Sequence, residues 1–539
     1  MSFITNIQPE VIIHRFDTDV FDASLFTQAI QIKKSVNQPV QTMSITFNPA
    51  REGKLSDNIS HAQILNYLKR KIKPQDIISV KIDNQNTEHS FLGFVDHVYE
   101  SVTTMNQSTG KTLKINCSLL LPKLLMRDNI VNSPVLVTNE KIKEVLKERT
   151  KFFGWTRGLT EDGKSPFVGK PVEAVKWILE NAPCTNTNLG SDINPKTFFD
   201  PKKNDFEGKS LLRFQFLEGE LLFSPQLSTY SGPILNYIYS CLDQAFYELF
   251  FDTTTGEDGL AYNTMTIRPK PFSFRDYNYR KNKTVRNWLN FEDLPVIPIH
   301  SSYRLSEELG INDFELKNFF TVNFTNALIG NASSYLGKFG VQFPVVNLDS
   351  ITKYGLRDLA VTSSTINMDD IIEQYNDKIG TEEPETIENI TSKNEGGMLN
   401  YLIDKREKIV EWFSYPFFDS GQISVPYSQK YKLGHRLFYE DREFFDVLND
   451  QIHRGVYYYI HSVDESFQYG SQPKTTLGLS RGLPENIASD WLNANRKKFV
   501  GINEFSQNKK ASGKGMIEIE DYEDILGIDE KIFDFEEVQ

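Results

Sequence analysis

Two glutamates lie close enough in the sequence to suggest acid–base chemistry. Glu218 and Glu220 occur in the run Phe-Leu-Glu-Gly-Glu-Leu-Leu, and hydrolysis of a glycosidic bond uses a pair of carboxyl groups. Such a pair must face across a cleft, about 5–10 Å apart and in different environments. Residues two apart on a strand share one face, so a solvated strand edge or a turn is the favoured interpretation of these glutamates.

The cysteine and serine patterns contain no recognisable nucleophile or metal site. The sequence has no Gly-x-Ser-x-Gly elbow, and Cys117, Cys184 and Cys241 lie in no protease signature and no Cys-x-x-Cys pair. Widely separated thiols of odd number support neither a disulfide framework nor a zinc site. We interpret them as core residues in a reducing cytoplasm, and we predict no metal, no cofactor and no catalytic residue.

The remaining binding candidates are weak for similar reasons. His97 and His461 lie in strand-like runs without the close spacing of metal ligands, and we expect their hydrogen bonds to be satisfied. Residues 512–515, Ser-Gly-Lys-Gly, lack the frame of a phosphate-binding loop and indicate a flexible turn. The basic and aromatic residues 275–286 have the types that bind single-stranded nucleic acid. In so acidic a chain, a solvated loop or a protein interface is favoured.

Length and charge limit the possible classes of protein. The chain has 539 residues, which at roughly 150 per domain allows three or four domains. Its 12% aromatic content, rich in Phe and Tyr, suits a β-rich structure. The first residues lack the features of a signal peptide, and the apolar window 327–346 is interrupted by polar residues, so no bilayer span is predicted. A formal net charge of −13 disfavours a surface that neutralises nucleic-acid phosphates.

Two segments far apart in the chain share one pattern. Residues 91–101 align by eye with residues 457–467, and each is followed by a polar turn and an alternating strand, at 111–117 and 474–480. Period-2 alternation predicts strands with one buried face. Either the likeness is common to all amphipathic hairpins, or the chain contains two similar antiparallel barrels. In the second segment, Tyr457, Tyr458 and Tyr459 are expected on an exposed aromatic edge.

Hydrophobic periodicity predicts the other elements. Strands are predicted over most of residues 11–121, with a short helix at 64–68. Further helices are predicted at 138–149, 172–181, 234–245 and 399–413, and further strands at 211–223, 246–252 and 265–268. In the last of these helices, Lys408 and Glu411 lie outside the apolar stripe.

The order of these motifs resembles that of a known family. Arg-Pro-Lys-Pro-Phe at 268–272, Gly-Gln-Ile-Ser-Val-Pro at 421–426 and Tyr-Lys-Leu-Gly-His-Arg-Leu at 431–437 are similar to the late-control-D family of phage baseplate hub proteins. That family includes the hub part of type VI secretion spikes, and the resemblance covers most of residues 10–482. It implies a homotrimer without enzymatic activity, whose six barrels form a pseudo-sixfold ring that joins a hexameric tail tube to a trimeric spike and lines the DNA channel.

The patterns and the resemblance together predict an α+β, β-rich chain with two similar tail-tube-like antiparallel β-barrels and α/β insertion domains. The expected segments are a first barrel at 1–125 that strands within 205–230 complete, a mixed insertion at 126–230, an α+β domain at 231–299, a second barrel at 300–482 with an acidic insertion at 367–397, and an acidic tail at 483–539. Apolar residues among the charges of residues 517–539 indicate a docking segment.

The resemblance also implies partners and a location. The partners are the tail tube protein, the central spike, other baseplate proteins and the tape measure protein. DNA passes through the channel without specific binding, and no stable membrane association is expected. The location is the virion tail baseplate, after assembly in the host cytoplasm. Two alternatives remain: a tail-associated peptidoglycan hydrolase built on the same barrels, for which the residues after 482 are few, and an unrelated carbohydrate-binding protein.

Overall fold

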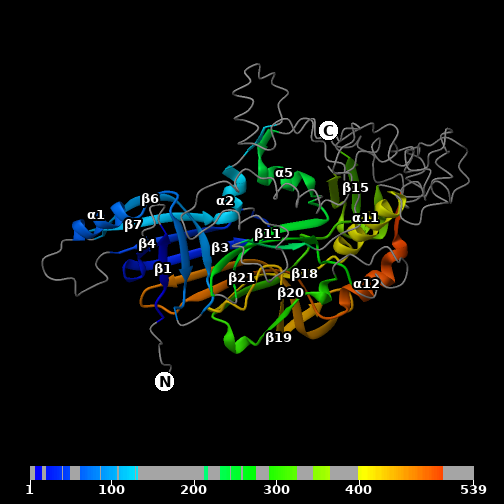
Figure 1. The fold of residues 1–539 in the computed structure, drawn as a ribbon. Coiled ribbons are helices and arrows are strands. Elements are labelled where there is room, and N and C mark those ends of the chain that lie inside the picture. Colours follow the sequence, from blue (N-terminus) through cyan, green and yellow to red (C-terminus); the bar gives the residue numbers. More distant parts are fainter. Residues whose placement is uncertain are drawn as a thin grey trace, which may run out of the picture. The chain divides into compact units, whose positions relative to one another are not determined.

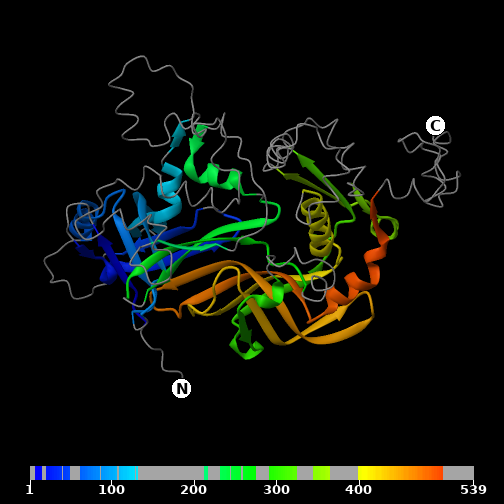
Figure 2. The same ribbon diagram turned by 45° about the vertical axis from the view of Figure 1, so that its right-hand side comes forward.

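The chain folds into two compact units, each built from separated stretches of sequence (Figures 1 and 2). Unit 1 comprises Met1–Pro271, Arg286–Asn312 and Phe418–Glu485, and unit 2 comprises Phe272–Val285, Asp313–Phe417 and Asn486–Gln539. The residues described by this computed structural model are 7–14, 20–38, 40–48, 61–84, 87–105, 108–127, 129–131, 212–216, 231–242, 244–256, 259–274, 290–324, 344–363 and 398–501.

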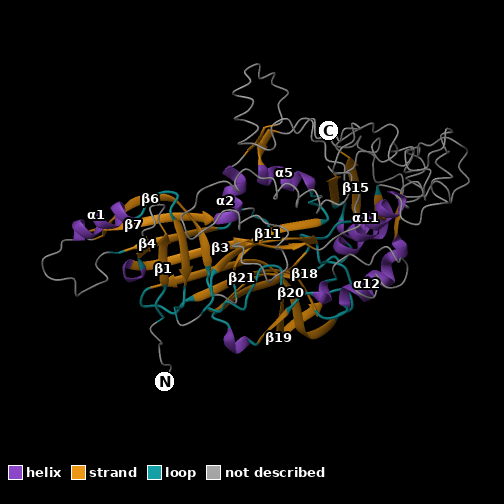
Figure 3. Cartoon of the chain, viewed as in Figure 1, coloured by secondary structure: helices purple, strands orange, loops and turns teal. Residues whose placement is uncertain are grey.

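Unit 1 is organised around one 13-stranded sheet (Figure 3). Its first half contains β1 (Glu10–His14), β2 (Val20–Asp22), β3 (Thr27–Ser35), β4 (Thr42–Phe47), β5 (Ile77–Lys81), β6 (Phe91–Met105) and β7 (Ser108–Leu119). Its second half contains β13 (Val296–Ile299), β14 (Ser306–Asn312), β18 (Phe418–Pro426), β19 (Arg436–Asp446), β20 (Gln451–Gln468) and β21 (Lys474–Leu483). The chain is β-rich with a large antiparallel sheet, as its alternating patterns predict.

The two halves of this sheet repeat one scheme of strand pairing. In the first half, β3 pairs with β4, β4 with β7, β7 with β6 and β6 with β5. In the second half, β14 pairs with β18, β18 with β21, β21 with β20 and β20 with β19. The matching strands also follow one another in the same order along the chain. The likeness between residues 91–117 and 457–480 therefore reflects a repeated topology.

The register of these pairs corrects the alignment made by eye. Val95 pairs with Cys117, and Ile460 pairs with Leu479, and in each long strand the next residue forms a β-bulge. Val95 therefore corresponds to Ile460, whereas the alignment by eye placed it against His461 and was wrong by one residue. A shift of one residue exchanges the two faces of a strand. Each bulge adds one residue that interrupts the alternation, so the alternating pattern does not give the register on both sides of it.

The long strand β20 joins the two halves into one sheet. Its residues 451–459 pair with β19, and its residues 462–468 pair with residues 29–35 of β3. The change of partner falls at the bulge of His461. Among the described strands, the sheet is open, with β14 at one end of the strand order and β2 at the other. No described strand pairing closes either half into a barrel.

A smaller sheet in unit 1 contains β9 (Leu212–Phe216), β11 (Tyr247–Thr255) and β12 (Ala261–Pro269). The antiparallel pair β11 and β12 matches the two strands predicted in this region. The strand expected to complete the first barrel instead pairs in parallel with β12, as β9. A short apolar run carries no signal for its partner, so the sequence alone did not distinguish these two sheets.

The described helices of unit 1 are short. They are α1 (His61–Lys71), α2 (Leu120–Arg127) and α5 (Ile234–Cys241), the last ending earlier than predicted. No helix in the described part of the chain is long and apolar enough to cross a membrane. The helices predicted at 138–149 and 172–181 lie outside the described residues.

Unit 2 interrupts the segment expected to form the second barrel. The chain leaves the large sheet after β14 and returns to it at β18. Unit 2 has a four-stranded sheet and three described α-helices, with the order β17, β15, β16, β22 in the sheet. These elements are β15 (Phe319–Phe324), β16 (Val345–Asn347), α8 (Leu348–Tyr354), β17 (Asp358–Ser363), α11 (Met398–Phe413), α12 (Ile487–Asn495) and β22 (Phe499–Gly501).

The C-terminal segment begins as part of unit 2. Helix α12 and strand β22 belong to the segment expected as a tail at 483–539, and β22 pairs with β16. Residues 502–539, and the acidic insertion at 367–397, lie outside the described residues. The sequence did not reveal the two elements because they are short and lie in a polar region.

Helix α11 buries a charged pair that the sequence placed outside its apolar stripe. Lys408 and Glu411 are each 1% exposed, and 2.7 Å separates Lys408 Nζ from Glu411 Oε2. Glu411 also accepts a hydrogen bond from the backbone N–H of Phe274. The two opposite charges compensate each other in the helix–loop contact, which makes their burial possible.

Candidate functional site

Most residues that the sequence raised as candidates are not among those described. Glu218, Glu220, residues 275–286 and residues 512–515 all lie outside the described part of the chain. The catalytic and nucleic-acid interpretations of these residues therefore stay untested. Within the described ranges, no group of three or more His, Cys, Asp or Glu residues has an arrangement that could hold a metal ion.

Three of the candidates are described, and each lies on a strand of the large sheet. His97 is exposed on β6, and His461 is half-buried in β20, where burial lowers its pKa. Cys117 is a free, buried thiol in β7, and burial raises its pKa above the usual range. The buried position of Cys117 agrees with its interpretation as a core residue.

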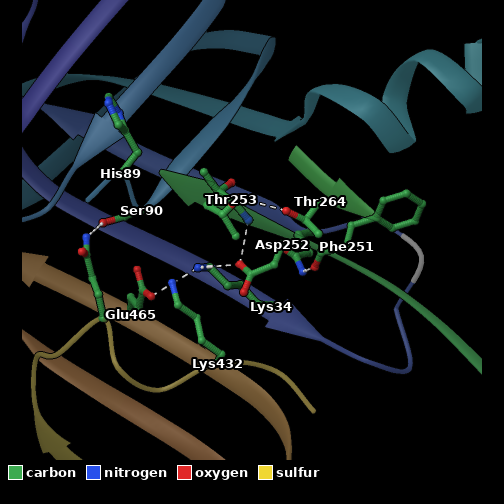
Figure 4. Close-up of polar contacts among 12 residues, drawn as sticks. Lys34, His89, Ser90, Phe251, Asp252, Thr253, Thr264, Lys432 and Glu465 are labelled. Atoms are coloured by element: carbon green, nitrogen blue, oxygen red, sulfur yellow. Dashed lines mark hydrogen bonds and ion pairs between the residues drawn. The ribbon is translucent and has the colours of Figure 1, made fainter. Parts of the chain in front are cut away.

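Unit 1 contains a buried ion cluster where β3, β11 and β20 meet (Figure 4). Lys34 Nζ lies 3.0 Å from Asp252 Oδ1 and 3.3 Å from Glu465 Oε1. The side chains of Lys34 and Glu465 are only 4% and 2% exposed. One lysine of the first half of the sheet is thus shared by a carboxylate of the second half and a carboxylate of the smaller sheet.

Strand alternation explains why these charges point inward. Ile30, Ile32 and Lys34 share the buried face of β3, and Val463 and Glu465 share the buried face of β20. A charged residue in phase with apolar neighbours was the signal that could have identified the cluster from the sequence. The sequence prediction does not include Lys34 or Glu465, because a buried charge is stable only beside a partner that long-range packing supplies.

The cluster shifts the pKa of each member. Burial opposes the charged form of Lys34, but the neighbouring carboxylates of Asp252 and Glu465 outweigh burial and raise its pKa. Burial also opposes ionisation of Asp252, yet Lys34 and Lys432 hold its pKa below the usual value. For Glu465, burial prevails over the attraction of Lys34 and raises the pKa. Glu465 Oε2 has no hydrogen-bond partner among the described atoms.

A polar network surrounds the cluster. The hydroxyls of Ser90 and Tyr427 lie 2.9 Å apart, and Gln429 Nε2 donates to the carbonyl of Glu88 at 2.7 Å. Burial, then the charge of Glu465, raise the pKa of Tyr427. These contacts connect the loop after β18 to the loop between β5 and β6. The loop of the second half is thereby fixed against the first half.

A second buried cluster connects the smaller sheet to β20. Arg268 Nε lies 2.6 Å from Glu248 Oε1, and the Tyr459 hydroxyl donates to Glu248 Oε2 at 2.7 Å. Arg268 Nη2 also donates to the carbonyl of Gly434 at 2.8 Å. These contacts correct the expectation of an exposed tyrosine edge, because Tyr458 and Tyr459 are both buried. Their hydroxyls reach acidic partners, which offsets the loss of water.

A third group of charges connects strands within the second half. Arg442 Nη2 lies 3.0 Å from Asp419 Oδ2, and the Tyr458 hydroxyl donates to the same Asp419 oxygen at 2.8 Å. The Tyr439 hydroxyl donates to Glu307 Oε2 at 2.8 Å. These bonds connect β18, β19 and β20, which follow one another in the sequence, and they join β14 to β19.

The chemistry of these clusters is that of fixed charge pairs. Each carboxylate at their centres faces a lysine or arginine from another strand, or a tyrosine hydroxyl. Removing one member of a buried pair leaves an uncompensated charge and typically costs about 3–5 kcal/mol. Burial and pairing together indicate that the clusters hold the strands of unit 1 in register.

Comparison with known proteins gives similar structures but no similar sequences. No family model matches this chain. No curated protein is similar enough in sequence to count as a relative.

Similar solved structures are those of tail and secretion proteins. One is the tail protein of Neisseria meningitidis, with 9% identity, a TM-score of 0.41, and coverage of 89% of this chain and 98% of that chain. Another is the 43 kDa tail protein of prophage MuSo2 from Shewanella oneidensis, with 10% identity, a TM-score of 0.39, and coverage of 88% and 98%. A third is an E. coli type VI secretion component, with 7% identity, a TM-score of 0.34, and coverage of 85% and 74%.

At these identities and TM-scores, no activity or partner transfers from those proteins to this chain. The E. coli protein is itself similar in structure to the bacteriophage T4 tail proteins gp27 and gp5. The solved structures similar to this chain thus include tail proteins and a type VI secretion component.

Proposed function

We propose that this chain is a structural hub of a phage tail baseplate or of a related contractile injection machine. In this proposal it forms a homotrimer and has no enzymatic activity. Each half of the large sheet in unit 1 corresponds to one tube-like barrel. Three copies form a ring of six such barrels. This ring joins a hexameric tail tube to a trimeric spike and lines the channel through which DNA passes. Its other partners are further baseplate proteins and the tape measure protein.

The repeated strand pairing of unit 1 is the observation that carries this proposal. The pairing of β3, β4, β7, β6 and β5 recurs in β14, β18, β21, β20 and β19. A closed cyclic trimer of a chain with two equivalent halves presents six similar surfaces around a threefold axis. Such an assembly meets a sixfold partner on one side and a threefold partner on the other.

The buried ion clusters fit a structural role. The cluster of Lys34, Asp252 and Glu465 connects strands from distant parts of the sequence. All three clusters pair carboxylates with cations. The net charge of −13 also suits a channel wall that DNA passes without binding, because neutralising phosphates requires lysine and arginine. In this proposal the protein is assembled in the host cytoplasm and resides in the virion tail, without stable membrane association.

Light scattering and electron microscopy of the purified full-length chain test this proposal. The expected result is a trimer, or a monomer that becomes trimeric with a tube or spike partner, and ring-shaped particles with a central channel. A stable dimer under all conditions would contradict the hub function. Duplex DNA should not bind tightly at physiological salt, and tight binding by the ring would contradict the channel function.

A further inference from the structure

Two strand edges in unit 1 have no partner strand among the described residues. The first is the outer edge of β14, residues 306–311, which pairs only with β18. The second is the edge of β6 at residues 97–102, because β5 pairs with β6 only through residues 91–94. We call these the β14 edge and the β6 edge. Exposed strand edges offer unpaired N–H and C=O groups to another strand.

The repeat within unit 1 supplies a template for covering both edges. The strand equivalent to β14 is β3, and the strand equivalent to β6 is β20. In the chain itself, residues 29–35 of β3 pair antiparallel with residues 462–468 of β20. The edges that are joined inside one molecule are therefore the counterparts of the two edges that remain open.

We propose that the β14 edge of one copy of the chain pairs antiparallel with the β6 edge of a second copy. The register follows from the template, residue by residue. Val463 pairs with Lys34 at the template junction, and the counterparts of these residues are Val98 and Ile311. Val98 of one copy therefore lies opposite Ile311 of the next, and Tyr99 lies opposite Gly310.

Burial at the template junction supports this pairing. Phe467 of β20 is 3% exposed, whereas its counterpart on the β6 edge, Val102, is 55% exposed. Lys34 of β3 is 4% exposed, whereas its counterpart on the β14 edge, Ile311, is 37% exposed. Val102 and Ile311 are therefore exposed apolar residues at positions that are buried in the template junction. Such exposure is expected for an interface that forms only between two copies.

The side chains on the two edges are compatible with one another. The pair Val98 and Ile311 is apolar, and β-branched pairs stabilise antiparallel strands. Tyr99, 43% exposed, lies opposite Gly310, where no atom lies within 4 Å of an added Cβ. An aromatic side chain covers the gap that a cross-strand glycine leaves. Neither edge therefore opposes a bulky or like-charged residue at these positions.

The proposed junction differs from its template in charge. Ile311 takes the place of Lys34, so the buried ion cluster has no equivalent between copies. Glu100, the counterpart of Glu465, forms an ion pair with Lys69 of its own half and needs no cation from the next copy. The junction inside the chain is thus fixed by charges, while the junction between copies rests on the apolar pair of Val98 and Ile311 and on backbone hydrogen bonds.

This inference deepens the proposed function, on which it rests for the closed ring, but the edge pairing itself does not fix the number of copies. The interface is head-to-tail, because one copy contributes β14 and the next contributes β6. Such an interface forms a ring when its rotation closes. The contact and the copy number are therefore measured separately.

Disulfide cross-linking of the full-length chain tests the register. The variant Val98→Cys with Ile311→Cys should form cross-linked multimers under mild oxidation, because opposite residues bring the Cα atoms within the roughly 7 Å that a disulfide spans. The matched control is Val98→Cys with Glu307→Cys. Glu307 lies four residues along β14, roughly 13 Å away, and this variant should stay uncross-linked, as should each single cysteine variant.

The outcomes separate this inference from the function proposed above. A ladder ending at three copies, formed only by the 98/311 pair, supports both. The same specific ladder ending at another number supports the edge pairing and overturns the trimer. Trimers in light scattering without cross-linking at 98/311, or with equal cross-linking at 98/307, overturn the edge pairing and leave the trimer. Monomers without cross-links, at every concentration and also with tube or spike partners, overturn both.

Charge variants give a second readout that needs no oxidation. Ile311→Glu should lower the fraction of multimer at least tenfold at a concentration where the natural chain is half assembled, because the new carboxylate would lie beside Glu100 of the next copy without a cation of its own. Val98→Lys combined with Ile311→Glu should restore assembly. Leu260→Glu is the matched control, because Leu260 is an exposed apolar residue of unit 1 that belongs to neither edge. Equal assembly of Ile311→Glu and Leu260→Glu would overturn the pairing.

Discussion

Lys34 of β3 and Glu465 of β20 form a buried ion pair, with 3.3 Å between Nζ and Oε1, although they come from opposite ends of the described chain. Asp252 of β11 lies 3.0 Å from the same lysine. Three segments that are distant in the sequence are therefore held together at one nitrogen atom.

Loss of the shared lysine should strongly destabilise unit 1. The variant Lys34→Met leaves Asp252 and Glu465 without their common cation, and the expected loss is about 3–5 kcal/mol of unfolding free energy. Glu465→Gln keeps the pair of Lys34 with Asp252 and should cost less. Denaturant unfolding measures both variants. Arg454→Ala is the control, because Arg454 pairs with Glu443 on the surface, and such pairs contribute about 0–1 kcal/mol. Equal effects for Lys34→Met and Arg454→Ala would contradict a stabilising role for the cluster.

Gly434 should not tolerate a side chain. Its φ of +72° favours glycine, and an added Cβ would overlap Nη2 of Arg268, which donates to the carbonyl of this glycine. Gly470 has a similar φ of +80° but open space around the Cβ position. Gly470→Ala should cost about 1–2 kcal/mol for the backbone conformation. Gly434→Ala should cost about 1–3 kcal/mol more because of the overlap. Thermal unfolding of the two variants compares them, and a smaller loss for Gly434→Ala would refute the packing argument.

His435 should make unit 1 less stable in mild acid. Burial, assisted by the charge of Arg268, lowers its pKa from 6.5 to about 4. Between these values the unfolded chain binds the proton and the folded chain does not, so the unfolding free energy falls as the pH drops from 6.5 to 4. The contribution of this residue reaches about 3 kcal/mol. Denaturant unfolding from pH 7 to 4 measures it, as the difference between the natural chain and His435→Gln. A difference that does not change with pH would contradict a neutral His435.

The acidic segment at the end of the chain should act as a docking segment. Its residues lie outside those described, and the expectation rests on the apolar side chains embedded among its carboxylates. Deletion of residues 515–539 should leave trimers intact but lower the incorporation of one baseplate component. Binding of that component should weaken with salt, because the carboxylates would face a basic surface. Complete, infective particles at normal yield from the truncated chain would instead support a segment without a docking role.

The sequence alone predicted much of the local structure and indicated the repeat as one of two interpretations. Period-2 alternation at residues 111–117 and 474–480 predicted β7 and β21, and apolar periodicity predicted α11. These patterns arise because the burial of one face places apolar residues at a fixed spacing in the sequence. The same alternation indicates the buried face for Lys34, because this residue is in phase with Ile30 and Ile32. These signals lie within one strand or helix, so neighbouring residues are sufficient to reveal them.

Only the tertiary structure decided which strands meet. The sequence did not reveal that β9 pairs with β12, that β20 pairs with β3, or that unit 2 separates β14 from β18. It also contained no sign that Asp252 shares Lys34 with Glu465. Strand pairing joins backbone groups that are the same in every residue, and a buried charge is stable only beside a partner that long-range packing supplies. The pairing and the ion cluster are therefore properties of the whole fold.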